Sequence, residues 1–220
     1  YLPEHWANDS DRCNKAAIPE ANKRYQSKCE IALSMIEKAL QHGVRFGYVA
    51  IDAGYGKDAA FLRGVDNLGC TFVADVHCKQ MMYLEDPAPH VPDWNGRGRR
   101  PTHLRAQSEA IRVDQWASEQ PDTAWRRIKL REGEKGTLEA QYLHTLVWVW
   151  DGTEPQARCW HLACRREIGA REISHYCLSN APFETPLQRL AQVQVQRFFI
   201  EYSFREAKSE CGMADYQVRR

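Results

Sequence analysis

The chain has 220 residues, of which 43% are hydrophobic, enough for the core of one large domain or of a domain with an insertion. Its 30 lysines and arginines nearly balance its 29 aspartates and glutamates, so any nucleic-acid surface has to come from local clusters. Because no apolar run approaches the roughly 18 residues that span a membrane, and no signal segment opens the chain, we expect a cytoplasmic protein without a membrane partner.

The first third of the chain alternates between helix and strand patterns. Residues 20–42 show helical spacing of apolar side chains and end before Gly43. Residues 44–56 contain a short apolar run that ends in an Asp-and-Gly turn, which predicts a buried strand. A second helix over 57–69 and a second strand over 70–77 follow. This order predicts an α/β sheet with parallel strands.

The middle of the chain has a different character. Residues 80–122 hold many prolines, no sustained period and the basic loop "NGRGRRPTHLR". Residues 124–180 alternate as strands do, and Trp148 and Trp150 alternate with Val147 and Val149, which predicts an antiparallel insert. Residues 186–211 return to a helix pattern that starts at Pro186 and ends before Gly212.

The eight cysteines give no sign of a metal site or a disulfide framework. None of them forms a C-x-x-C pair of the kind that structural zinc sites use. Cys159 and Cys164 are the closest pair and lie in a predicted strand. We therefore expect reduced, packed thiols.

Asp52 is the first candidate site residue. It ends the first predicted strand and precedes Gly54 and Gly56. The carboxyl ends of strands in open α/β sheets are where sites gather. The alternative is that Asp52 only caps a turn or the following helix, and its position alone does not decide between the two.

The last predicted helix carries two polar edges where a surface helix needs only one. At 3.6 residues per turn, Gln194, Arg197, Arg205 and Lys208 all fall within about 40° of Glu201. The opposite edge consists of Gln188, Gln192, Gln196, Ser203 and Glu206. If one edge faces water, the edge with Glu201 faces a cleft or a charged partner. The alternative is i,i+4 ion pairing on a solvated face.

The same residues carry a family resemblance. Arg197-x3-Glu201-x6-Lys208 resembles the R-x3-E-x6-K part of the YREK motif of bacterial insertion-sequence DDE transposases, which are DDE superfamily endonucleases. "IDAGYG" resembles their second-aspartate motif. "YLPEHWANDSDRC", "VWVWDG", "ARCWHL", "LSNAP" and "AKSECGMADYQVR" are also similar to one branch, so the resemblance runs through nearly the whole chain.

The resemblance implies an α/β fold with a partial RNase H-like core, in which a mixed sheet with flanking helices is interrupted by a β-rich insertion. Residues 1–79 would then be partial core with the second catalytic aspartate. Residues 80–183 would be the insertion, and residues 184–220 the core helix with the catalytic glutamate. The strand pattern over 124–180 agrees independently with an insertion there.

The resemblance also implies the site. Asp52 and Glu201 would be catalytic and would bind two divalent ions, Mg²⁺ or Mn²⁺, which prefer hard oxygen ligands. Arg197 and Lys208, with Arg205 as a weaker candidate, would contact DNA phosphates. Arg97, Arg99, Arg100 and Arg105 of the basic loop are further backbone-contact candidates, against a solvated loop as the alternative. Trp148 and Trp150 would stack on an unpaired base or, as we expect, pack in the sheet.

Two departures limit what the resemblance implies. Gln194 occupies the position of the motif's tyrosine. The family's first catalytic aspartate would lie upstream of the chain, because Asp9 and Asp11 fall in a polar loop, not in a strand. With an opening that lacks methionine and an abrupt end, we expect a fragment that lacks the N-terminal part and cleaves DNA poorly or not at all.

The expected function is therefore that of a transposase catalytic-domain fragment. The family reaction is metal-dependent phosphodiester hydrolysis and strand transfer at transposon ends. The partners would be transposon-end and target DNA, with a homo-oligomer in the intact, nucleoid-associated parent. The alternatives are a catalytically dead remnant that at most binds DNA, and a non-enzymatic α/β module whose basic stripe binds an acidic protein.

Overall fold

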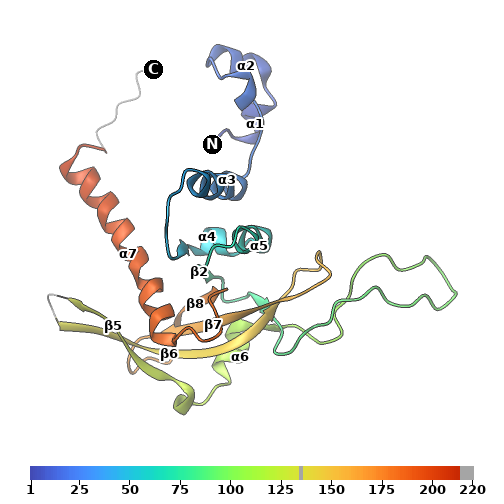
Figure 1. Cartoon of the computed structure of the whole chain (residues 1–220), viewed down its shortest axis with the longest axis vertical. Coiled ribbons are helices and arrows are strands. Elements are labelled where there is room, and N and C mark those ends of the chain that lie inside the picture. The colour runs from blue at the N-terminus through green and yellow to red at the C-terminus, as the bar shows by residue number, and fades with distance from the viewer. Residues whose placement is uncertain (134–135, 214–220) are drawn as a thin grey trace.

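The computed structural model describes residues 1–133 and 136–213 (Figure 1). The α-helices are α1 (Glu4–Ala7), α2 (Ser10–Lys15), α3 (Lys28–Gln41), α4 (Ala53–Gly56), α5 (Ala59–Asn67), α6 (Val113–Ser118) and α7 (Leu187–Glu210). The strands are β1 (Val49–Ile51), β2 (Phe72–Val76), β3 (Met81–Met82), β4 (Ile111–Arg112), β5 (Arg126–Gly133), β6 (Gly136–Val149), β7 (Arg158–Arg166) and β8 (Ile173–Ser179). Short 3₁₀ helices cover Glu20–Asn22 and Asp122–Ala124.

Six strands form one curled mixed sheet in the order β1-β2-β8-β7-β6-β5. β1 and β2 are parallel, as the helix–strand alternation predicts, and the remaining neighbours are antiparallel. The strands of the predicted insertion continue the core sheet, because β8 pairs directly with β2. β3 and β4 form a separate two-stranded ribbon.

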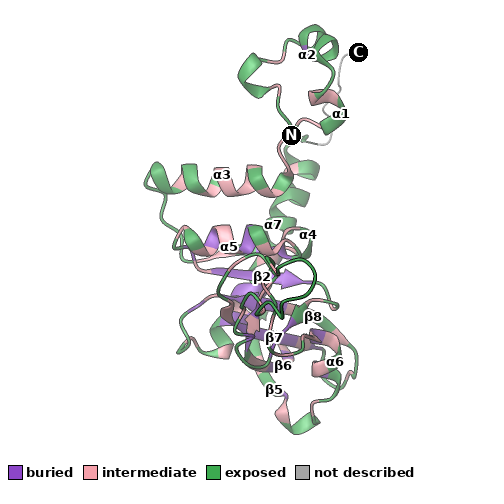
Figure 2. Ribbon diagram, turned by 90° about the vertical axis from the view of Figure 1, so that its right-hand side faces the viewer, coloured by how far each residue is buried: buried purple, intermediate pink, exposed green. Residues whose placement is uncertain are grey.

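The two faces of the sheet have different covers. Phe72 and Ala74 of β2 belong to the main core with Phe61, Leu62 and Val65 of α5. Val73 of β2 packs instead with Leu190 and Val193 of α7. Because side chains alternate between the faces of a strand, α5 and α7 lie on opposite sides of the sheet. Figure 2 shows that buried residues concentrate in the sheet and in α5.

The first long helix begins later than the sequence pattern predicts. The pattern predicts a helix over 20–42, but α3 starts at Lys28. Ser27 is its N-cap and forms a capping box with Glu30, in which each side chain bonds the other's backbone N–H. This box fixes the start, and only a 3₁₀ turn, Glu20–Asn22, precedes it. The prediction for 20–27 is therefore wrong.

The next three predicted elements hold with adjusted bounds. Of the predicted strand over 44–56, only Val49–Ile51 is extended, and α4 replaces the turn. α5 and β2 lie within the predicted ranges 57–69 and 70–77. α7 spans Leu187–Glu210 with Pro186 as N-cap, which confirms the prediction over 186–211.

The segment between β3 and β4 is a long arm, residues 83–110, which extends away from the sheet (Figure 1). An isolated antiparallel bridge between His90 and Arg105 joins its two sides. Nearer the sheet, Tyr83 pairs with Trp148 of β6. The indole of Trp150 donates a 2.7 Å hydrogen bond to the Glu154 carbonyl oxygen, in agreement with tryptophans that pack at the sheet.

The helices, the cysteines and the sheet each bear on an expectation from the sequence. Among residues 1–133 and 136–213, none of the helices combines the length and the apolar character needed to cross a membrane. The eight cysteines are free thiols, and burial raises the pKa of Cys164 to about 12. A mixed sheet flanked by helices and extended by antiparallel strands is the partial RNase H-like core that the sequence predicts.

Candidate active site around Arg197

Asp52 has two contacts, one for each carboxylate oxygen. It follows β1 directly and is the N-cap of α4, where its Oδ1 accepts a 3.1 Å hydrogen bond from the Tyr55 N–H. Its Oδ2 lies 3.9 Å from Nη1 of Arg197. The capping role that the sequence left open is therefore real, and it leaves the second oxygen available for a site.

Asp75 stands beside Asp52 in the neighbouring strand. The parallel register pairs Ile51 with Ala74, so the next residues along both strands, Asp52 and Asp75, follow at the same level. Asp75 alternates with Ala74 and therefore points to the α7 side of the sheet. Its side chain is only 11% exposed, against 46% for Asp52.

The guanidinium of Arg197 lies among three carboxylates. Besides Asp52, its Nη2 is 3.7 Å from Oδ2 of Asp75 and 3.6 Å from Oε1 of Glu201. All three separations exceed hydrogen-bond length, so these are ion pairs without hydrogen bonding. Because the Glu201 side chain is 67% exposed, solvent weakens that pair most. The Arg197–Glu201 pair of the alternative interpretation is present, and it is combined with contacts to Asp75 of β2 and to Asp52, which directly follows β1.

A buried chain of hydrogen bonds between β6, α7 and β2 holds Asp75 in this arrangement. The Tyr142 hydroxyl donates to Oε1 of Gln194 at 2.9 Å, and Nε2 of Gln194 donates to Oδ1 of Asp75 at 2.8 Å. Tyr142 is fully buried, and this burial raises the pKa of its phenol above the ordinary value, so the hydroxyl stays a neutral donor. Gln194, at the position of the motif's tyrosine, thus links α7 to β2 and β6.

A pocket of about 260 Å³ opens beside Arg197. Its charged and polar walls come from five elements: Asp75 of β2, Arg131 of β5, Arg165 of β7, His175 of β8, and Gln194, Arg197 and Glu201 of α7. Burial is the main cause that lowers the pKa of His175; the negative charge of Asp75 opposes this shift, and the positive charges of Arg165 and Arg197 add to it. Burial, assisted by these two arginines, therefore favours the neutral imidazole.

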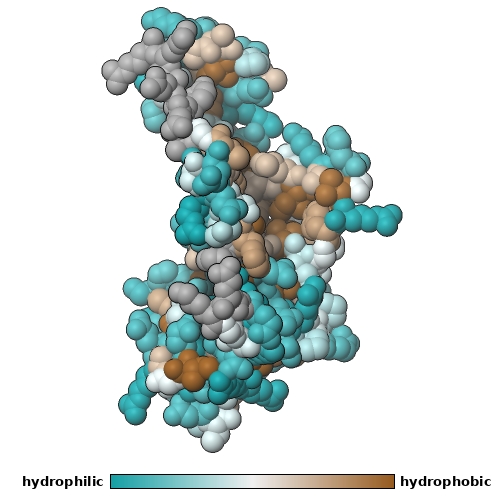
Figure 3. Space-filling view, turned by 90° about the vertical axis from the view of Figure 1, so that its left-hand side faces the viewer, coloured by the Kyte–Doolittle hydropathy of each residue, from teal (hydrophilic) through white to brown (hydrophobic). Residues whose placement is uncertain are grey.

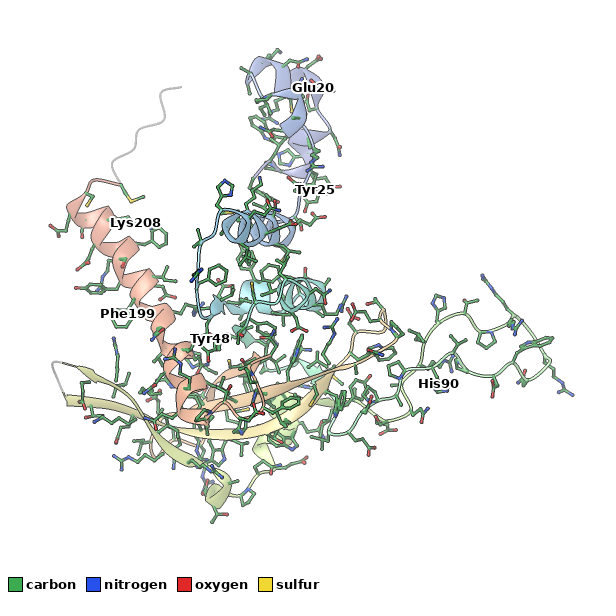
Figure 4. The ribbon with its side chains drawn as sticks, viewed as in Figure 1. Glu20, Tyr25, Tyr48, His90, Phe199 and Lys208 are labelled. Atoms are coloured by element: carbon green, nitrogen blue, oxygen red, sulfur yellow. The ribbon has the colours of Figure 1, made fainter. Side chains whose placement is uncertain are left out.

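Arg205 and Lys208 lie farther along α7, where the helix has left the sheet. Both are exposed, and with Glu201 and Phe204 they line a shallow hollow of about 660 Å³. Figure 4 shows Phe199 and Lys208 on this rising part of the helix. The polar edge predicted to face a cleft therefore does so at Gln194 and Arg197, and becomes open surface at Arg205 and Lys208.

Apolar side chains are also exposed around this part of the molecule. On α7, Phe199, Ile200 and Phe204 are each more than half exposed. Met35 of α3 is 66% exposed, and apolar surface is visible over the helical part in Figure 3. The guanidinium of Arg131 lies 5.3 Å from the Phe199 ring centre, which ties β5 to the helix at this level.

The basic loop is not brought to the acids. Arg97, Arg99 and Arg100 are exposed on the arm between β3 and β4, with Arg105 on its returning side. In Figures 1 and 4 the arm, marked by His90 in Figure 4, extends to the right, whereas α7 lies at the left. Any contact that these arginines make is therefore separate from the Arg197 cluster.

The donor chemistry suits a divalent ion, but the arrangement does not complete a site for one. Asp52 and Glu201 offer hard carboxylate oxygens, which Mg²⁺ prefers. Yet within residues 1–133 and 136–213 no group of three histidine, cysteine, aspartate or glutamate side chains is placed to hold a metal. The carboxylates converge on the Arg197 guanidinium instead.

Sequence reasoning did not identify Asp75, Tyr142, Arg131, Arg165 or His175. A signal for Asp75 exists: it is the one charged residue inside the apolar strand "FVADV", at the same distance from its strand start as Asp52 from Val49. The other four lie on strands of the predicted insertion. They meet α7 only through the register of β5 to β8, which no local pattern encodes.

Comparison with known families concerns the part of the chain that carries Asp52 and Asp75. The sequence profile of the DDE superfamily endonuclease family matches residues 1–137, which include Asp52 and Asp75 and end before α7. A search of curated proteins gives no match to the chain. The match covers more than half of the 220 residues, and the chain belongs to the DDE superfamily endonuclease family.

Proposed function

We propose that this chain serves DNA transposition as part of the catalytic domain of a DDE transposase, which cuts phosphodiester bonds at transposon ends and joins them to target DNA. The observation that carries the proposal is the cluster itself. Arg197 joins Asp52, at the end of a core strand, to Glu201, which is 149 residues away in the sequence. Both acids also stand in stretches that resemble the motifs of such transposases, and Asp52 lies within the residues that the family profile matches.

Asp52 and Glu201 would supply two of the carboxylates that hold a pair of Mg²⁺ or Mn²⁺ ions. Such ions, when bound, activate the attacking oxygen and stabilise the leaving oxygen in phosphoryl transfer. The chain's own part is to fix the two acids. Asp52 is fixed by its bond to the Tyr55 N–H, and Glu201 by its place on α7, one turn after Arg197.

The basic residues would bind the DNA backbone. Arg197 lies closest to the acids and would neutralise a phosphate beside the scissile bond. Arg205 and Lys208 would contact the strand farther along α7, and Arg97, Arg99 and Arg100 would reach a separate stretch of DNA from the arm. Such contacts give affinity and placement rather than sequence readout. The protein would act as a homo-oligomer at the bacterial nucleoid, in the cytoplasm.

The test is cleavage of a plasmid that carries the encoding element with its flanking DNA, by the full-length gene product with Mg²⁺. Asp52→Asn and Glu201→Gln keep the side-chain size and remove the charge, so each should abolish cleavage while DNA binding persists. Glu206→Gln, on the solvent edge of the same helix, is the matched control and should cleave normally. Persisting Mg²⁺-dependent cleavage in both variants would disprove the assignment.

A second candidate function is DNA binding without cleavage. The observation that favours it is the ion pairing of Arg197 with Asp52 and Glu201, because an arginine between the acids balances charge that a metal would otherwise balance. Under this alternative the unmodified protein binds DNA with a steep salt dependence and leaves the plasmid intact at every Mg²⁺ concentration.

A further inference from the structure

The pocket beside Arg197 gathers positive charge from three separate elements. Arg131 comes from β5, Arg165 from β7 and Arg197 from α7, and only Asp75 and Glu201 oppose them among its lining residues. The formal charge of the described lining is therefore +1 with His175 neutral. Arg131 and Arg165 lie on strands of the predicted insertion and are not part of the family motif that supplies Arg197 and Glu201.

Arg165 carries a donor that no described group satisfies. Its Nη2 bonds Oε1 of Glu167 at 2.9 Å, but its Nε is buried and has no hydrogen-bond partner among residues 1–133 and 136–213. The Arg165 side chain is only 15% exposed, whereas Glu167 is 57% exposed. A guanidinium at this depth with an unused N–H is uncommon, because buried polar groups are nearly always paired.

The charges that surround the pocket favour an oxyanion over a cation. Asp75 is already bonded by Gln194 and ion-paired with Arg197, so its charge is largely compensated. Glu201 stands at the open edge, mostly in solvent. The guanidinium groups of Arg131, Arg165 and Arg197 are planar, and the spacing of their N–H donors matches the oxygens of a phosphate.

We propose that this pocket binds one phosphate group of a nucleic-acid backbone, with Arg131 and Arg165 as its ligands from the inserted strands and Arg197 from α7. The proposal rests on the proposed action on DNA and deepens it by assigning the inserted sheet a direct share in backbone binding. The volume of about 260 Å³ is below that of most small-molecule sites, which are roughly 300–1,000 Å³. It suits a single phosphate held at one side of Asp52 and Glu201.

The salt dependence of DNA affinity tests the proposal in the full-length protein. Each phosphate contact contributes about 0.9 to the slope of log K against log salt on duplex DNA. Arg131→Gln and Arg165→Gln should each weaken binding of a duplex of arbitrary sequence and reduce this slope by up to about 0.9, the contribution of the single phosphate in the pocket. Arg127→Gln is the matched control, because Arg127 lies on the same strand β5, is 64% exposed and pairs with Glu139.

Two results would overturn the pocket as a phosphate site. One is an unchanged slope in both pocket variants. The other is a reduction by Arg127→Gln equal to that by Arg131→Gln, which would show only a general loss of charge. Arg131→Gln keeps the test valid if Arg165→Gln does not fold, since Arg131 lies on β5, at the edge of the sheet, whereas Arg165 lies on the inner strand β7.

A spectroscopic readout locates the bound group. His175 lies in the pocket wall, where Asp75, Arg165, Glu167 and Arg197 face it. Adding inorganic phosphate in a phosphate-free buffer should shift the His175 imidazole resonances saturably in the unmodified protein and leave them unshifted in Arg165→Gln. The DNA duplex should produce a shift at the same residue and compete with phosphate.

The source of the oxyanion is settled by competition. If inorganic phosphate shifts His175 while DNA neither shifts it nor competes, the nucleic-acid assignment is wrong. Polyglutamate that competes as well as DNA would indicate an acidic protein partner and also overturn it. These outcomes are independent of the cleavage test. If Asp52→Asn leaves cleavage intact while the pocket variants weaken DNA binding, the proposed function fails and the pocket assignment stands. If Asp52→Asn abolishes cleavage while the pocket variants bind DNA normally, the pocket assignment fails and the proposed function stands.

Discussion

The Tyr142 hydroxyl donates a 2.9 Å hydrogen bond to the side-chain oxygen of Gln194, deep between β6 and α7. This bond fixes the orientation of the Gln194 amide, so that its nitrogen faces Asp75. The position that the family motif gives to a tyrosine on the helix is here a glutamine, and the structure supplies a tyrosine hydroxyl from the sheet beneath it.

The first prediction concerns this bond. Tyr142→Phe leaves the buried Gln194 oxygen without its donor and should lower the free energy of unfolding by about 1–3 kcal/mol. In a Gln194→Leu background, where that oxygen is gone, the same change should cost less, which gives a coupling of at least about 0.5 kcal/mol. Urea unfolding of the four proteins measures both. Equal costs in the two backgrounds would show that the bond contributes nothing.

The second prediction is a pH dependence from His144 on β6. Burial lowers its pKa to about 4, with smaller contributions from His161, whose Nδ1 lies 2.8 Å from the His144 Nε2, and from Arg126. Since the folded pKa is below the ordinary 6.5, the unfolded chain binds a proton that the folded chain does not. Stability from this source is therefore complete above about pH 6.5 and is lost as the pH falls toward 4.

The measurement is the free energy of unfolding at pH 7.5 and at pH 4 for the unmodified protein and for His144→Gln. The fall in the His144 pKa corresponds to roughly 3 kcal/mol at most. The loss on acidification should be smaller in the variant by up to this amount, because the carboxylates are common to both proteins. An identical loss in the two proteins would contradict the prediction.

The third prediction concerns Gly56, at the end of α4. A Cβ added there would overlap the backbone carbonyl oxygen of Asp75, so α4 and β2 can approach only without a side chain. Gly56→Ala should destabilise the fold by roughly 1–3 kcal/mol or more and displace Asp52, which caps α4. Gly47→Ala, where an added Cβ meets nothing within 4 Å, is the control.

Thermal unfolding separates the two glycine variants. The melting temperature of Gly47→Ala should stay close to that of the unmodified protein, since surface changes rarely exceed about 0.5 kcal/mol. If Gly56→Ala had the same melting temperature as Gly47→Ala, α4 would be shown to move away from β2 without a loss of stability.

The fourth prediction concerns Asn180, which joins β2 to the segment after β8. Its Oδ1 accepts from the Phe72 N–H at 2.7 Å, and its Nδ2 donates to Oδ1 of Asp66 at 2.6 Å and to the Cys70 carbonyl at 3.0 Å. Asn180→Ala leaves these groups unpaired and should cost roughly 2–3 kcal/mol in unfolding free energy. Asn67→Ala, which loses one bond to Arg158, should cost under about 1 kcal/mol.

Three elements were predictable from the sequence. α5 buries one regular face, β2 is a short apolar run that is buried on both faces, and α7 starts at a proline, so all three fall where the pattern places them. The start of α3 was not predictable in this way. Apolar spacing continues upstream of Lys28, whereas the capping box of Ser27 and Glu30 sets the boundary. At this boundary the capping hydrogen bonds, and not the apolar spacing, determine where the helix starts.

The candidate site was predictable only in part, because its residues lie far apart in the sequence. Asp52 and Glu201 carry motif spacings, and their catalytic role stays a prediction. Their grouping with Asp75 and Arg197 depends on the parallel register of β1 and β2 and on where α7 crosses the sheet. Tyr142 reaches Gln194 across 52 residues, and no periodicity relates positions so far apart.

The one-sided anchoring of α7 has a mechanical consequence. Leu190, Ala191 and Val193 press the first half of the helix onto the sheet, while the half with Phe204 and Lys208 is exposed. At a rise of 1.5 Å per residue, Glu201 lies about 10 Å and Lys208 about 21 Å beyond Gln194. A tilt of the helix about Gln194 would therefore move Lys208 about twice as far as Glu201.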